Sequence, residues 1–122
     1  MSQNITLAEA VEMTSRYRAQ HESILIPEMQ GKGILPICET IDRTQVDSLL
    51  AQPGCTKIRI YYGMYADQTV HAVLVGVDAA DADILPTTTS LSATNTDFED
   101  GDIVNQGYRC PPICPPSSDL NT

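Results

Sequence analysis

The sequence is poor in large aromatic residues. It has no tryptophan and a single phenylalanine, Phe98, so five tyrosines supply most of the aromatic surface among 122 residues. A core built from this chain must therefore consist mainly of Ile, Leu, Val and Ala side chains. The length suits one domain and is too short for two independent cores.

Basic residues are scarce as well. Seven Lys and Arg stand against sixteen Asp and Glu, which gives a net charge of −9. The excess lies in residues 66–122, where Arg109 is the one cation against nine acids. An acidic protein repels phosphate backbones and anionic lipid surfaces. Because no run of basic residues interrupts this charge, we expect neither nucleic-acid nor membrane binding.

Long hydrophobic segments are missing too. Residues 1–4 have no basic stretch and no apolar core of a leader, and no segment approaches the roughly 20 apolar residues that cross a bilayer. We therefore expect a cytoplasmic protein. In a reducing cytosol, cysteines are expected to be free thiols or metal ligands. The four here are Cys38, Cys55, Cys110 and Cys114.

Two helices are predicted in the first half of the chain. Thr6 and Glu9 form a capping box, and apolar residues recur at helical spacing from there toward Pro27. A second, shorter helix is predicted from an N-cap at Asp42 to the Pro-Gly pair at residues 53–54.

The strongest strand signal is a β-hairpin that spans residues 57–77. Two runs rich in β-branched and aromatic residues, Lys57–Gly63 and Thr69–Val77, are separated by five residues. Alternation places one mainly apolar set of side chains on a single face, which we expect both helices to cover. That set is Ile58, Ile60, Tyr62, Val70, Ala72 and Leu74. A hairpin alone is only marginally stable, so a further strand is expected from residues 34–41, 82–85 or 103–108.

The opposite face of the hairpin is mixed in character. The predicted register places Tyr61 opposite His71 and Arg59 opposite Val73. Apolar area around a cationic group is typical of a protein interface. The residues Arg59, Tyr61, His71 and Val73 are therefore predicted to form a self-association surface.

An enzymatic function has weak sequence support. His71 beside Tyr61 resembles the start of an acid–base site, but His21 is the one other histidine. The sequence has no G-x-S-x-G motif and no glycine loop before a helix. A small-molecule enzyme acting through His71 and Tyr61 would require a pocket over the mixed face of the hairpin.

The cysteines leave two alternatives open. Cys110 and Cys114 supply one close pair for a zinc site, and Cys38 and Cys55 would have to supply the other ligands although they lack the usual short spacing. A reversible disulfide between Cys110 and Cys114 is the second alternative, because a thiol-redox role needs such a pair.

The hairpin and the tail together carry a resemblance. The segments Arg59–Gly63 and Val70–Asp78, followed by Cys-Pro-Pro-Ile-Cys-Pro-Pro at residues 110–116 and by Leu120-Asn121, resemble a group of small uncharacterised bacterial proteins. This resemblance implies no activity and no catalytic residue. It implies that the Cys-Pro tail is an integral part of the protein.

The sequence thus predicts an α+β protein in which two N-terminal helices pack on a small, mainly antiparallel sheet centred on the 57–77 hairpin. Residues 1–109 would form a single domain, and residues 110–122 would form an extended Pro-Cys tail lying across the domain or a neighbouring subunit. The predicted function is that of a non-enzymatic interaction or assembly protein, with a protein partner or itself, forming a homo-oligomer. The alternative is a metal-binding protein, with zinc as the metal, or a thiol-redox protein that uses the C-terminal cysteine pair.

Overall fold

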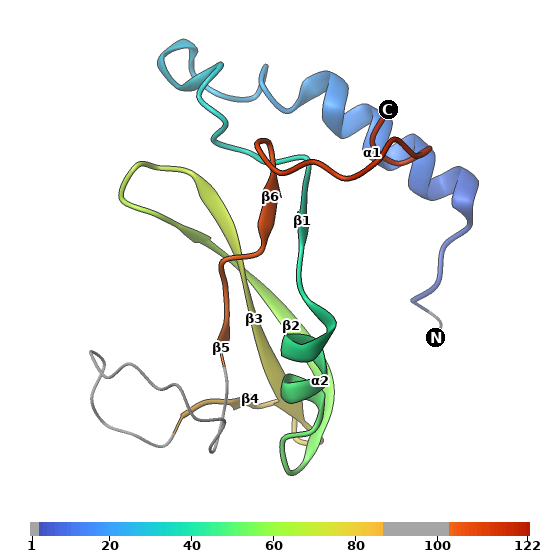
Figure 1. The fold of residues 1–122 in the computed structure, drawn as a ribbon, viewed down its shortest axis with the longest axis vertical. Coiled ribbons are helices and arrows are strands. Elements are labelled where there is room, and N and C mark those ends of the chain that lie inside the picture. Colours follow the sequence, from blue (N-terminus) through green and yellow to red (C-terminus); the bar gives the residue numbers. More distant parts are fainter. Residues whose placement is uncertain (1–2, 87–102) are drawn as a thin grey trace.

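The computed structural model describes residues 3–86 and 103–122. Its helical elements are α1 (Leu7–Gln20), the 3₁₀ turn η1 (Pro27–Met29) and α2 (Arg43–Leu50). Its strands are β1 (Cys38–Thr40), β2 (Cys55–Met64), β3 (Val70–Asp78), β4 (Asp83–Ile84), β5 (Ile103–Val104) and β6 (Tyr108–Cys110). The predicted α+β class, with antiparallel sheets centred on a hairpin, is confirmed (Figure 1).

The strands form two separate sheets. In the larger, β2 pairs with β3, and the other edge of β3 pairs with β4 and with β5. In the smaller, β1 pairs antiparallel with β6 (Figure 1). Of the three segments predicted as a further strand, residues 82–85 and 103–108 contribute β4 and β5 to the sheet of the hairpin, whereas residues 34–41 contribute β1 to the smaller sheet.

The register of the hairpin differs from the predicted one. Gly63 lies opposite His71, and Tyr61 lies opposite Val73, so the predicted pairing was wrong by two residues. The turn has the predicted length of five residues but lies one residue further along the chain, from Tyr65 to Thr69, and it closes through a 3.0 Å hydrogen bond from the Tyr65 N–H to the Thr69 carbonyl. Because side chains alternate with a period of two, an even shift leaves each side chain on its predicted face.

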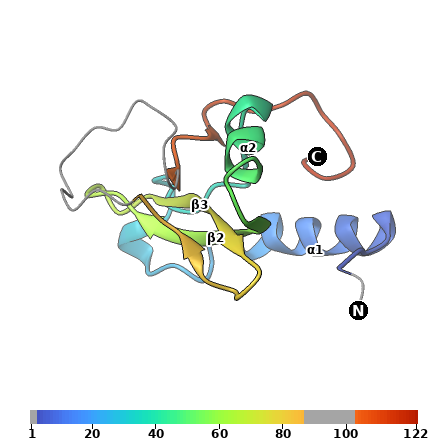
Figure 2. The same ribbon diagram turned by 90° about the horizontal axis from the view of Figure 1, so that it is seen from below.

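The core lies between α2 and one face of the larger sheet. Leu49 is fully buried against Leu74 and Val104, and Ile41, Ile58 and Ala72 pack around them. This small core forms between one short helix and strands whose apolar side chains alternate with polar ones. It is aliphatic, as the scarcity of Trp and Phe predicted. Figure 2 shows α2 lying across this face of the sheet.

Gly76 lets the end of α2 approach β3 closely. A Cβ atom at this position would lie 2.8 Å from the Gln52 Nε2 atom and 3.3 Å from the Leu49 carbonyl oxygen. Both neighbours belong to the C-terminal end of α2 or the turn that follows it. A side chain larger than hydrogen would therefore push the helix away from the sheet.

The position of α1 corrects the expectation that both helices cover the sheet. The helix begins as predicted, with the Thr6 hydroxyl accepting the Glu9 N–H at 3.0 Å, but none of its residues is buried. It lies to one side of the hairpin and beside the C-terminal tail (Figures 1 and 2). Its Tyr17 hydroxyl donates to the Pro36 carbonyl at 2.7 Å, ahead of β1. An amphipathic stripe predicts a helix but not the surface on which the helix packs.

Side chains join the two sheets at the free part of the β3 edge. Glu39 on β1 accepts the Ala72 N–H at 2.8 Å, and Asn105 donates to the Ala72 carbonyl at 2.7 Å. Arg109 on β6 donates through Nε to the Val70 carbonyl at 3.2 Å. These bonds satisfy backbone groups that would otherwise be left without partners where β5 ends. No helix within the described ranges is long and apolar enough to span a membrane.

Candidate interaction surface

The second edge of β2 is unpaired. Within residues 3–86 and 103–122, β2 pairs with β3 alone. Tyr62 lies opposite Ala72, whose N–H and carbonyl point away from β2 toward Glu39 and Asn105. Two opposite residues of an antiparallel pair that do not hydrogen-bond to each other both point their backbone N–H and carbonyl groups away from the partner strand. The Tyr62 backbone groups therefore point away from β3, and those of Ile60 follow by the same alternation.

Exposed apolar side chains border this edge. Ile60, Tyr62 and Met64 are 52%, 82% and 63% exposed. All three belong to the face that carries the core, but they lie beyond the part that α2 covers. A long edge strand with apolar side chains is a template for pairing with another chain unless charges or a covering element protect it.

The sequence reasoning missed these three residues because it assigned the face of Ile60 and Tyr62 to a helix-covered core and placed Met64 in the hairpin turn. The short length of the second helix could have indicated that these side chains are exposed. A helix of eight residues spans about 12 Å, whereas a strand of ten residues spans about 33 Å. A single short helix leaves much of the strand uncovered.

On the outer face, the predicted interaction residue Arg59 pairs with two carboxylates, those of Asp81 in the turn before β4 and of Asp83 at the start of β4. Its Nη1 and Nη2 atoms lie 2.6 Å from Asp83 Oδ1 and 2.8 Å from Asp81 Oδ1. Lys57 pairs with the same Asp81 carboxylate at 3.0 Å. The cationic character that the sequence suggested for this face is therefore largely neutralised within the chain.

Tyr61 takes part in the same cluster, since its hydroxyl donates to Asp83 Oδ2. This hydrogen bond is the main cause that lowers the pKa of Asp83 below its ordinary value, and the Arg59 guanidinium adds to it. The same bond raises the pKa of Tyr61. For Asp81, the hydrogen bond and charge of Lys57 lower the pKa. The cluster holds both carboxylates in their charged form at neutral pH.

His71 is buried, which corrects its predicted place on an exposed surface. It is 8% exposed, and its ring stacks on that of Tyr65 with 3.5 Å between the centroids. Its Nε2 atom lies 2.7 Å from the Thr69 hydroxyl, which donates to Asp67 at 2.6 Å. These contacts hold the hairpin turn together. Of the predicted set, Arg59, Tyr61 and Val73 share the outer face with His71, but His71 cannot contact a partner there.

The enzyme alternative required Tyr61 beside His71 under a pocket. The structure places Gly63, not Tyr61, opposite His71. The cavities found in the described part of the chain border α1, and neither His71 nor Tyr61 lines them. This geometry offers no support for acid–base catalysis by the pair.

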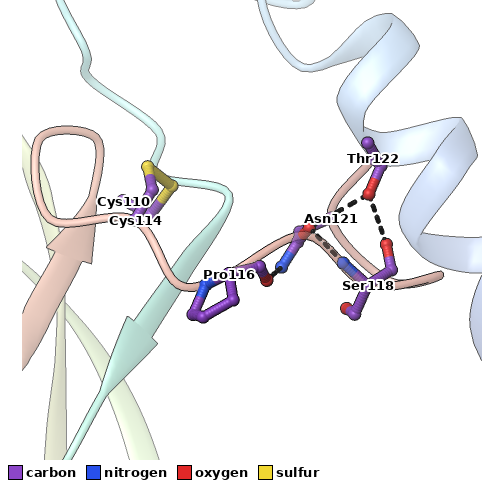
Figure 3. The surroundings of a disulfide bond; sticks show 6 residues. All are labelled: Cys110, Cys114, Pro116, Ser118, Asn121 and Thr122. Atoms are coloured by element: carbon purple, nitrogen blue, oxygen red, sulfur yellow. Dashed lines mark hydrogen bonds between the residues drawn. A yellow bond between two sulfur atoms is a disulfide. The ribbon is translucent and has the colours of Figure 1, made fainter.

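The four cysteines do not converge. Cys110 and Cys114 form a disulfide with 4.5 Å between their Cα atoms, which corrects the expectation of free thiols or metal ligands for this pair (Figure 3). Cys38 lies on β1 opposite Cys110, whereas Cys55 begins β2 in the other sheet. Among the residues that the structure describes, no group of three or more His, Cys, Asp or Glu side chains suits a metal ion. The zinc alternative therefore has no ligand set here.

The Pro-Cys tail lies across its own chain. After the disulfide it runs to α1 (Figures 1 and 3). There the Arg18 guanidinium donates to the carbonyl oxygens of Leu120 and Thr122. A turn closes the end, because the Asn121 side chain accepts the Ser118 N–H at 2.9 Å. The tail thus links the N-terminal helix to β6.

Comparison with known proteins gives no family for this chain. No family model, curated protein or solved structure matches it. The resemblance to small bacterial proteins stays a prediction, and the residues of this chain carry the functional proposal.

Proposed function

We propose that this protein is a non-enzymatic assembly protein that self-associates by pairing β2 of one copy with β2 of a second copy. The observation that carries the proposal is the unpaired edge of this ten-residue strand, bordered by the exposed side chains of Ile60, Tyr62 and Met64. Addition of a strand to an exposed sheet edge is a recurring mode of protein recognition.

A second copy fits this edge by symmetry. Two antiparallel β2 strands related by a two-fold axis would present the same outward N–H and carbonyl groups to each other, which makes the contact self-complementary and closed. The exposed Tyr62 and Ile60 side chains would then pack across the axis and leave water together.

Charge also favours this edge over other surfaces for contact between copies. The chain carries a net charge of −9, so two copies repel each other over most approaches. Strand β2 contains Lys57 and Arg59 and no acidic residue. Because Asp81 and Asp83 neutralise these cations, two copies meet with less repulsion where β2 faces β2 than where two acidic surfaces meet.

Sedimentation velocity across a series of protein concentrations tests the proposal. The wild-type chain is expected to shift from monomer toward dimer as concentration rises. Ile60→Lys should keep the protein monomeric, because a charged side chain at the centre of an edge strand opposes pairing. Ile24→Lys is the matched control: Ile24 is 72% exposed but lies beyond α1, so dimerisation should persist.

The proposal fails in either of two cases. Wild-type protein that stays monomeric at every concentration would remove its basis. Dimerisation that survives Ile60→Lys but is lost in Ile24→Lys would move the interface to the region of α1.

A further inference from the structure

Cys38 lies directly across from one sulfur of the disulfide. In the β1–β6 pair its Cα partner is Cys110, which is itself bonded to Cys114. Directly opposite residues of an antiparallel pair have Cα atoms about 4.5–5.5 Å apart and place their side chains on the same face. Disulfides form over Cα distances of about 4.4–6.8 Å. A bond between Cys38 and Cys110 is therefore compatible with the Cα spacing of the strand pair.

The three cysteines differ in their access to solvent. Cys110 is 1% exposed, Cys38 is half-buried and free, and Cys114 is exposed. The buried cysteine of the disulfide thus lies on β6 beside β1, and its exposed cysteine lies in the tail. An attack from Cys38 would reach the buried sulfur, and the leaving group would be the accessible one.

We propose that Cys38, Cys110 and Cys114 form a thiol–disulfide exchange site. The Cys38 thiolate attacks Sγ of Cys110, a Cys38–Cys110 bond forms, and the Cys110–Cys114 bond breaks. The electron pair of the broken bond stays on Cys114, which leaves as a thiolate and takes the proton that Cys38 lost to solvent. The number of disulfides is unchanged, so the step needs no external oxidant or reductant.

The exchange converts a half-buried thiol into an exposed one. In the first form the reactive sulfur of Cys38 is sheltered beside β6, and in the second form Cys114 presents a thiol on the surface. A surface thiol of this kind reacts with low-molecular-weight disulfides to give a mixed disulfide and one released thiol. The site would therefore take small disulfides as its substrate class, at Cys114.

The exchange also opens the ring that starts the tail. In the Cys110–Cys114 form, the Ile113 N–H donates to the Arg109 carbonyl at 2.8 Å and the disulfide closes the turn. Once Cys110 is bonded to Cys38, that closure is lost, while the far end of the tail still contacts Arg18. The exchange thus changes the tail near β6 and leaves its contact with α1.

Cys55 supplies a matched control within the same chain. It is a free cysteine of intermediate exposure, like Cys38, but its thiol donates to the Lys57 carbonyl at 3.3 Å on β2. It lies in the other sheet, so it takes no part in the proposed step.

Alkylation with N-ethylmaleimide under native conditions tests the proposal. The starting material is protein with one disulfide, checked by intact mass, in buffer free of reductant, and the labelled positions are found by peptide mass spectrometry. In the wild type we expect label on Cys114 together with a Cys38–Cys110 disulfide. In Cys38→Ser the label on Cys114 should be lost, and in Cys55→Ser it should persist. The rate should be independent of protein concentration, because the step is intramolecular.

A second variant tests the product directly. Oxidised Cys114→Ser should contain a Cys38–Cys110 disulfide. The proposal is overturned if this bond fails to form in that folded variant. It is also overturned if Cys114 is never labelled in the wild type, or if it is labelled equally in Cys38→Ser.

Discussion

At the scale of single residues, the carboxylates of Asp81, in the turn before β4, and of Asp83, on β4, neutralise the cations of β2. Asp83 is the centre of this cluster, because it accepts from both Arg59 and Tyr61. The predicted interaction residues Arg59 and Tyr61 thus have partners within the chain, and their first role is to hold β2 and the turn together. A partner would have to compete with these contacts or bind beside them.

The free energy of unfolding should fall at low pH because the carboxylates of this cluster become protonated. The pKa values of Asp83 and Asp81 are lower in the folded chain than their ordinary values. Their contribution to the free energy of unfolding is therefore complete above the pKa of the unfolded chain, about 4, and is lost as the pH falls through the pKa of the folded chain. In Asp83→Asn the melting temperature should drop at pH 7, and its difference from the wild type should shrink toward pH 3. Thermal unfolding followed by circular dichroism measures this.

Asp119→Asn is the control for that series, since Asp119 is an exposed residue of the tail. Its melting temperature should follow that of the wild type. A difference between the wild type and Asp83→Asn that stays constant from pH 7 to pH 3 would contradict the account.

Substitution of two adjacent leucines of α2 tests the packing of the core. Leu49 is fully buried and Leu50 is 48% exposed. Leu49→Ala should lower the free energy of unfolding by about 2–5 kcal/mol, because it removes buried methyl groups and leaves a cavity. Leu50→Ala should change it by less than about 0.5 kcal/mol. Urea denaturation distinguishes the two, and equal effects would show that α2 does not pack as described.

At the scale of elements, the sequence predicted what is local and missed what is distant. The capping box at Thr6 and Glu9 gave the start of α1, and the β-branched runs gave the hairpin. The pairing of β1 with β6, which brings Cys38 to Cys110, joins segments far apart in the chain. No local pattern encodes such a pairing.

The hairpin register shows the same limit on a smaller scale. Both possible turns are compatible with the alternation of apolar side chains, which fixes the faces but not a shift of two residues. The observed turn is stabilised by contacts among its own side chains, such as the Asp67–Thr69 hydrogen bond and the stacking of Tyr65 on His71. The burial of His71 follows from this turn and could not be predicted from its place in the strand.

The junction between the sheets depends on Glu39. Its carboxylate accepts the Ala72 N–H at a part of the β3 edge that no strand of residues 3–86 and 103–122 covers. Glu39→Ala should lower the free energy of unfolding by about 1–3 kcal/mol, because a part-buried backbone donor loses its charged partner. It should also speed hydrogen exchange at the Ala72 amide. Glu39→Gln keeps an acceptor and should restore most of the protection, while an unchanged exchange rate at Ala72 in Glu39→Ala would contradict this role.

At the scale of the whole molecule, the position of α1 leaves the hairpin partly uncovered. The tail binds α1 through Arg18 and keeps it beside β6, so α2 is the helix that covers the sheet. The side chains of Ile60 and Tyr62, which the sequence assigned to a core, and that of Met64 are exposed as a result. The proposed self-association gives those residues a partner that the single chain does not provide.

Hydrogen exchange of the β2 amides at low and high protein concentration tests this proposal most directly. The Ile60 and Tyr62 amides point away from β3, whereas the Tyr61 amide points toward Val73. Self-association through β2 predicts that Ile60 and Tyr62 become protected as concentration rises, while Tyr61 is protected throughout. Exchange at Ile60 and Tyr62 that stays fast at every concentration would contradict the pairing of β2 with a second copy.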